Sequence, residues 1–144
     1  MKTLLDDGVR DAFVAAMVSA LRDTIGIEAV SAVVPETATG PVAVTIDVSG
    51  DVRGPVTWVF PPDIALELVS RLLEEKNPPL TAVNDGATEL ANILTGYATE
   101  VLEAHGFRCE IGVPMLHEGA MPPGIHVHMT TAKGPIQLVL SLWC

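Results

Sequence analysis

The sequence predicts an α+β fold of two similar halves, each a helix followed by three strands, with helices packed on a mainly antiparallel sheet. Three observations predict this class. Apolar residues recur at steps of three and four in three segments, which is the period of a helix with one buried face. In other segments apolar and polar residues alternate, as in strands with one buried face. Landmark residues of the two halves also recur at one constant spacing.

The first half begins with a helix. Its apolar face runs from Val9 to Thr24, and Gly26 is a residue type often found just after a helix end. The strands of this half are predicted at 27–34, 42–48 and, after a Gly-Pro turn, 56–60.

Two more helices are predicted between residues 60 and 106. The first begins at Pro62, since proline is favoured in the first turn, and runs to about Glu75. The second can be capped at its start by Asn84 or Asp85, and it runs to His105. The first of these helices links the halves, and the second opens the second half.

The second half repeats the order of the first, with strands predicted at 107–113, 125–130 and 136–142. Gly106 follows Gly26 by 80 residues, and Gly134 follows Gly54 by 80 as well. Chance could produce one such match because Gly-Pro turns are common, but several landmarks share the spacing. We therefore interpret residues 1–144 as one internally duplicated domain, which their number also suits.

The charge and composition of the chain restrict its partners and its compartment. The formal net charge is -10, which disfavours nucleic acid and anionic membranes and suits a partner with exposed Lys or Arg. No apolar run is long enough to span a bilayer. Two aspartates follow Leu4 and Leu5 directly, which is unlike the apolar core of a signal peptide. Cys109 and Cys144 fit neither a zinc ribbon nor a redox CxxC motif. We therefore expect a reduced, cytoplasmic protein.

The segment 85–96 carries the most informative polar pattern. Glu89 and Asn92 are three residues apart on the predicted helix, so both project from one face. Gly96 follows on that face, where glycine costs about 1 kcal/mol relative to alanine, and a small residue there would let another protein approach. The predicted buried stripe consists of Leu90, Ile93, Leu94, Tyr97, Val101 and Leu102. On spacing alone, such a pair is most often two ordinary solvated residues.

In its context this pattern resembles the CheX/CheC/FliY family of chemotaxis phosphatases. The family motif is Asp or Ser, three residues, Glu, two residues, Asn, and a proline twenty-odd residues later. Asp85, Glu89, Asn92 and Pro114 match it. The resemblance is specific over 85–119 and loose before residue 60, and it implies a duplicated CheC-like fold.

The resemblance also bears on the number of sites. CheC-like members can carry one site in each half. Val9 and Ala12 stand 80 residues before Glu89 and Asn92, so the first helix is expected to lack the pair. One site per chain is the CheX pattern, and this resemblance implies a homodimer joined through the sheets.

The resemblance implies removal of phosphate from the aspartyl-phosphate of a CheY-like response regulator. By likeness to the family, Asn92 would orient the attacking water and Glu89 would pair with the regulator's active-site Lys. No cofactor of the chain's own is implied, because the regulator supplies its Mg²⁺. A hundredfold gain in rate requires the activation free energy to fall by only about 2.7 kcal/mol, which positioning of the attacking water can provide. Asp85 is interpreted as a helix cap rather than a catalyst.

Two other interpretations stay open. A non-catalytic adaptor of the same fold could bind a response regulator or a flagellar switch protein without turnover. A metal-binding domain is the other, since His126 and His128 are two apart on a predicted strand and could bind a metal with His117. The alternation places the strand histidines on the polar face, however, which favours solvated side chains.

Overall fold

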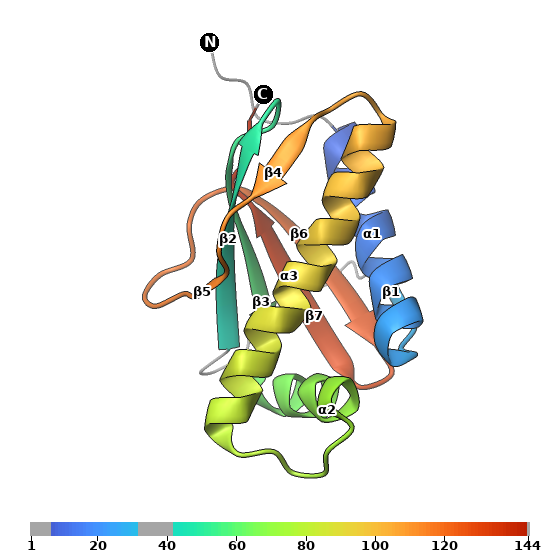
Figure 1. The fold of residues 1–144 in the computed structure, drawn as a ribbon, viewed down its shortest axis with the longest axis vertical. Coiled ribbons are helices and arrows are strands. Elements are labelled where there is room, and N and C mark those ends of the chain that lie inside the picture. Colours follow the sequence, from blue (N-terminus) through green and yellow to red (C-terminus); the bar gives the residue numbers. More distant parts are fainter. Residues whose placement is uncertain (1–6, 32–41, 144) are drawn as a thin grey trace.

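The computed structural model describes residues 7–31 and 42–143. Within these residues the chain forms three helices and seven strands (Figure 1). The helices are α1 (Asp7–Ile25), α2 (Pro62–Leu73) and α3 (Leu80–Ala104). The strands are β1 (Ala29–Ser31), β2 (Val42–Gly50), β3 (Gly54–Phe60), β4 (Cys109–Ile111), β5 (Met115–Leu116), β6 (Ile125–Thr131) and β7 (Gly134–Leu140). The predicted α+β class is confirmed, with β5 as an additional short strand.

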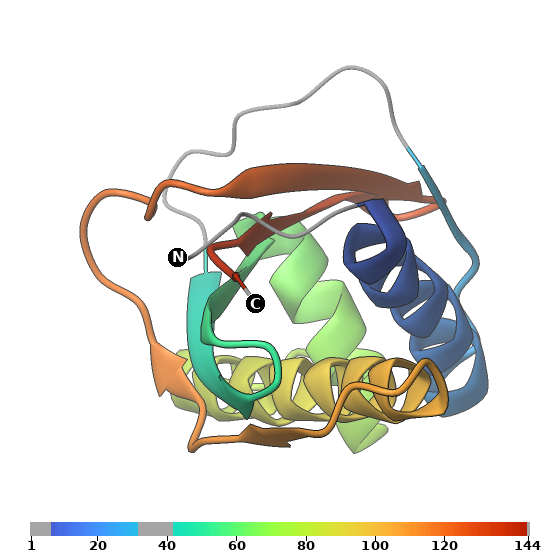
Figure 2. The same ribbon diagram turned by 90° about the horizontal axis from the view of Figure 1, so that it is seen from above.

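The strands form one sheet in which every pair is antiparallel. The order is β1-β6-β7-β3-β2-β4, and β5 also pairs with β2. β4 and β5 therefore share one edge of the sheet, and β1 forms the other. Figure 2 shows the sheet curving around the helices, which lie on its concave side. The core fills the space between them, and Trp58, Phe13, Phe60 and Met17 are among its largest fully buried side chains.

The sheet order is symmetric with respect to the two halves. β1, β2 and β3 correspond to β4, β6 and β7. When each strand is replaced by its counterpart, the order reads β4-β2-β3-β7-β6-β1, which is the observed order reversed. The central register agrees, since Trp58 of β3 pairs with Leu138 of β7 and the two residues are 80 apart. A pseudo-twofold axis therefore passes between the central strands, which confirms the internal duplication.

The start of α3 differs from the sequence prediction. The helix begins at Leu80 with Pro79 at its N-cap, because prolines are tolerated where the first N–H groups have no intrahelical acceptor. Asn84 and Asp85 therefore lie inside the helix. The interpretation of either residue as its cap is wrong.

Several other elements end before the predicted residue. α2 ends at Leu73, and Glu74 adopts the left-handed conformation with φ of 56°. Of the predicted strand at 107–113 only β4 forms, and the last strand ends at Leu140. Residues 32–34 of the first predicted strand lie outside the described residues.

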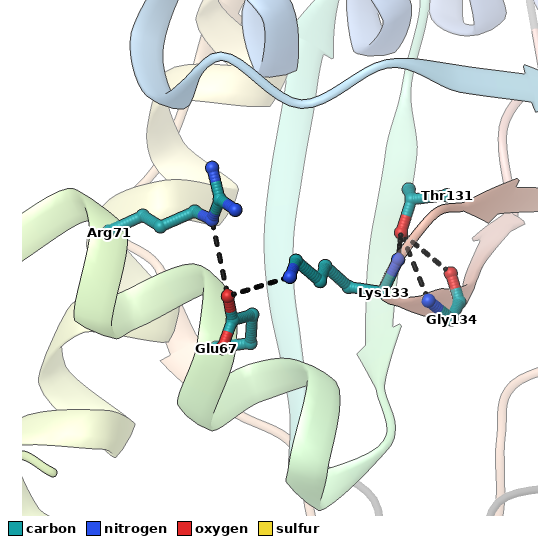
Figure 3. Close-up of polar contacts among 5 residues, drawn as sticks. All are labelled: Glu67, Arg71, Thr131, Lys133 and Gly134. Atoms are coloured by element: carbon teal, nitrogen blue, oxygen red, sulfur yellow. Dashed lines mark hydrogen bonds and ion pairs between the residues drawn. The ribbon is translucent and has the colours of Figure 1, made fainter.

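A charged cluster ties α2 to the turn between β6 and β7 (Figure 3). Glu67 Oε1 accepts a hydrogen bond from Arg71 Nε at 3.3 Å and lies 3.5 Å from Lys133 Nζ. The Arg71 hydrogen bond and the Lys133 charge lower the pKa of Glu67. Thr131 Oγ1 accepts the N–H groups of Lys133 and Gly134, both at 3.1 Å, and donates to the Gly134 carbonyl. The turn is thus fixed both internally and against α2.

Candidate functional site

α3 is held to the sheet by a buried polar contact at its centre. Trp58 Nε1 on β3 donates a hydrogen bond to Thr95 Oγ1 at 2.9 Å. The same hydroxyl donates to the Ala91 carbonyl one turn earlier, at 2.7 Å. All three residues are buried. The hydroxyl is thus used as donor and acceptor, and it fixes α3 in rotation next to the candidate residues.

The N-terminal half of α3 packs closely on α2. A Cβ atom at Gly86 would overlap the side chain of Val69 on α2, and no backbone constraint accounts for this glycine. Leu90 and Leu94 continue the buried stripe toward the middle of the helix. The packing on α2 and the contact with Trp58 fix the position of α3 and hence of the side chains on its exposed face.

Glu89 and Asn92 lie on the outward side of this helix, as the spacing predicts. Glu89 is exposed and Asn92 is half-buried. Among the described residues, no cation lies within ion-pair distance of Glu89 and no group hydrogen-bonds the Asn92 amide. Both polar groups are therefore available to a partner. The predicted buried stripe holds at Leu90, Leu94 and Leu102, whereas its other three members are only half-buried.

The outward side of α3 is acidic. The helix carries Asp85, Glu89, Glu100 and Glu103, and it contains no Lys or Arg. Asp85 is exposed, and its carbonyl accepts a hydrogen bond from Thr88 Oγ1 at 2.6 Å. A face of this charge favours a cationic group on the molecule that approaches it.

A hollow in the surface lies apart from the candidate residues. It has a volume of about 450 Å³, lies at the end of α2 and is open to solvent. Its lining residues run from Glu67 to Asn77 and include neither Glu89 nor Asn92. An exposed helix face suits recognition of another macromolecule better than enclosure of a small substrate.

Exposed apolar side chains at the adjoining sheet edge were not anticipated from the sequence. Val113, Met115 and Leu116 are 80%, 67% and 46% exposed. Pro114, the proline of the family motif, lies among them between β4 and β5. The only sequence signal for this exposed edge was the presence of three apolar residues around a proline. β5 has two residues, which is too short for an alternating pattern that would identify a strand and its exposed face.

The α1 residues that correspond to Glu89 and Asn92 are not those that the spacing of 80 predicts. Val9 and Ala12 stand 80 residues before Glu89 and Asn92, yet they are only 2% and 5% exposed and belong to the core. Glu89 is exposed. The spacing of 80 therefore does not hold inside the helices, and the matching of these two pairs was wrong.

The ends of α1 and α3 differ by one residue, which changes the spacing inside the helices from 80 to 81. The Leu21 carbonyl accepts a hydrogen bond from the N–H six residues later, whereas the Leu102 carbonyl accepts one from the N–H five residues later. These two leucines are 81 apart, and on that spacing Gly8 and Asp11 take the places of the candidate pair. Both are exposed, but α1 contains no asparagine or glutamine. It therefore carries no acid–amide pair.

His126 and His128 alternate with the buried Val127 and Met129 on β6, so they lie on the surface of the sheet that faces away from the helices. His126 Nδ1 accepts a hydrogen bond from Gln137 Nε2 at 2.8 Å, and its ring stacks on His128 with centroids 6.3 Å apart. Burial lowers the pKa of His128, and the nearby His126 lowers it further. His117 Nε2 donates to the Ala120 carbonyl at 2.9 Å. Within the described part of the chain, no three His, Cys, Asp or Glu side chains are grouped to hold a metal ion.

Comparison with protein families gives a match over residues 42–124, more than half of the chain, with the family described as chemotaxis phosphatase CheX. A search of curated proteins found no match. Among the described residues, no helix is long and apolar enough to cross a membrane.

Solved structures share the fold over nearly the whole chain. CheX from Vibrio vulnificus is 23% identical with a TM-score of 0.78, covering 94% of this chain and 95% of that one. A chain of the CheX–CheY–BeF3–Mg²⁺ complex from Borrelia burgdorferi is 21% identical with a TM-score of 0.72, covering 94% and 96%. FliY from Thermotoga maritima is 15% identical with a TM-score of 0.68, covering 96% and 92%.

Proposed function

The chain belongs to the chemotaxis phosphatase CheX family, and from this premise we propose that it dephosphorylates the aspartyl-phosphate of a CheY-like response regulator. The observation that best supports this function is the outward face of α3, where Glu89 and Asn92 lack partners among the described residues. A CheX in complex with CheY has the same fold, which supports a regulator as the partner.

Asn92 is the proposed catalytic residue. Its amide can accept a hydrogen bond from a water molecule and donate another to a phosphoryl oxygen, which places the water in line with the bond to be broken. The reaction transfers the phosphoryl group to water and returns the regulator's aspartate. It requires no nucleophile from this chain, because orientation and charge stabilisation provide most of the catalysis.

Glu89 is the proposed docking residue. Its carboxylate is exposed on an acidic helix without a neighbouring cation of its own among the described residues, so it can pair with a regulator lysine. We assign the Mg²⁺ of the reaction to the regulator.

The test measures phosphate release from phosphorylated CheY-like regulators of the host, with and without this protein. We expect Asn92→Ala to lower the stimulated rate about a hundredfold while the fold is retained. Asn84→Ala is the matched control, because it removes an amide from the same helix outside the outward face. Normal turnover by Asn92→Ala would exclude the assigned role.

A non-catalytic adaptor is the alternative that the same exposed face supports, because an unpartnered polar surface serves docking with or without turnover. The adaptor would bind the phosphorylated regulator, or a flagellar switch protein, and leave the phosphate half-life unchanged. The same release assay therefore separates the two functions.

We also propose a homodimer joined through the sheet edge formed by β4 and β5. The exposed Val113, Met115 and Leu116 support this edge, since apolar edge strands favour pairing with another chain. Sedimentation should show a dimer that Met115→Lys dissociates. Val30→Lys, on the opposite edge, is the control. Dissociation by Val30→Lys alone would assign the interface to β1.

A further inference from the structure

Gly96 is a helical glycine that this chain's own structure does not explain. It lies within α3, and its φ is not positive, so the backbone conformation is open to any residue. A Cβ atom built there would meet nothing within 4 Å among the described residues. Gly86 on the same helix differs, because Val69 fills the space that its side chain would need. Glycine in a helix interior weakens the helix relative to alanine, so Gly96 carries this cost without a benefit from the described part of the chain.

The position of Gly96 relates it to the proposed site. It lies one turn after Asn92 on the outward side of α3, adjacent in sequence to the buried Thr95. The Thr95 hydroxyl is held by Trp58 and Ala91. These contacts hold α3 against the rotation that would move an added side chain away from an approaching molecule.

We infer that Gly96 sets the distance at which the response regulator docks, by letting the regulator's surface contact the α3 backbone beside Asn92. This inference rests on the proposed function. A side chain at this position would hold the regulator away from the helix. Because the Asn92 amide must reach a phosphoryl group inside the partner, a displacement of about 1 Å is enough to lower the rate strongly.

The inference is tested with Gly96→Ala and Gly96→Leu, with Ala104→Leu as the control. Ala104 is exposed near the end of the same helix, so the control adds a leucine to α3 away from Asn92. Binding is titrated with a CheY-like regulator activated by beryllofluoride and Mg²⁺, and turnover is followed by phosphate release from the phosphorylated form. Thermal unfolding is recorded for every variant.

Gly96→Ala should raise the unfolding midpoint by about 3 °C, because alanine favours the helix. The same variant should weaken regulator binding about tenfold, Gly96→Leu should abolish it, and Ala104→Leu should bind as wild type. A more stable variant that works less well cannot be explained by damage to the fold.

The results separate this inference from the proposed function. If wild type binds and turns over the regulator and both Gly96 variants match it, the docking role is wrong and the phosphatase function stands. An equal loss in Ala104→Leu would also overturn the role, because the effect would not be local to Gly96. If wild type neither binds nor dephosphorylates any regulator tested, the proposed function fails and this inference fails with it.

Discussion

At the scale of single residues, the proposed site consists of two polar groups whose partners lie in another molecule. Glu89 and Asn92 have none among the described residues. Side chains that stabilise a fold are usually paired when they are polar and buried, whereas these are at the surface. Their replacement should therefore change docking and turnover and leave stability nearly unaffected.

Glu89→Gln tests the charge alone, because glutamine keeps the shape of the side chain. If the carboxylate pairs with a regulator lysine, the Kd for the activated regulator should rise about tenfold at low salt. The difference from wild type should narrow at high salt, since screening weakens the pair in wild type. Titration at two salt concentrations measures both effects.

Glu100→Gln is the control for net charge. Glu100 is exposed on the same helix and lies eleven residues beyond Glu89. An equal loss of affinity in both variants would indicate general attraction between an acidic helix and a basic partner instead of a specific pair.

At the scale of elements, the position of α3 depends on its contact with β3. Thr95→Val removes the acceptor of the buried Trp58 N–H, which then lacks its hydrogen bond. We expect a loss of about 1–3 kcal/mol in the free energy of unfolding, measured by urea denaturation. Thr95→Ser keeps the hydroxyl and should recover most of the loss. Wild-type stability in Thr95→Val would show that the contact does not hold the helix.

The crossing of α3 and α2 gives a second prediction at this scale. Gly86→Ala places a methyl group against Val69, and overpacking of this kind typically costs about 1–3 kcal/mol. Adding Val69→Ala should relieve the overlap, so the double variant should lose less than the two single losses combined. Additive losses would mean that the two residues do not compete for the same space.

At the scale of the whole molecule, acid should weaken the attachment of α2 to the β6–β7 turn. Arg71 and Lys133 lower the folded-state pKa of Glu67 below its ordinary value of 4.5. A lowered pKa stabilises the fold above the ordinary value, and this stabilisation is lost as pH falls through the folded-state pKa. The deficit of Glu67→Gln in urea midpoint should therefore be present at neutral pH and disappear in acid. A constant deficit at every pH would assign it to packing.

Most of the fold could be predicted from the sequence because its elements have strong local periods. The stripe of α1 and the alternation in β2 and β6 reflect one buried face per element, whereas residues 56–60 of β3 and 138–140 of β7 are buried on both faces. The errors lie where periods are weak. α3 begins before the predicted caps because two prolines can start a helix without a side-chain cap, and β5 is only two residues long.

The sequence by itself determined the two-half organisation and the presence of Glu89 and Asn92 on one helix face, since both follow from spacing along the chain. Only the tertiary structure decided that Glu89 and Asn92 lack partners among the described residues, that Val9 and Ala12 are buried and are not their counterparts, and that a Cβ atom at Gly96 would meet nothing within 4 Å there. The reason is physical: helical period fixes which residues share a face, but the rotation of the helix is set by distant contacts such as Trp58 to Thr95.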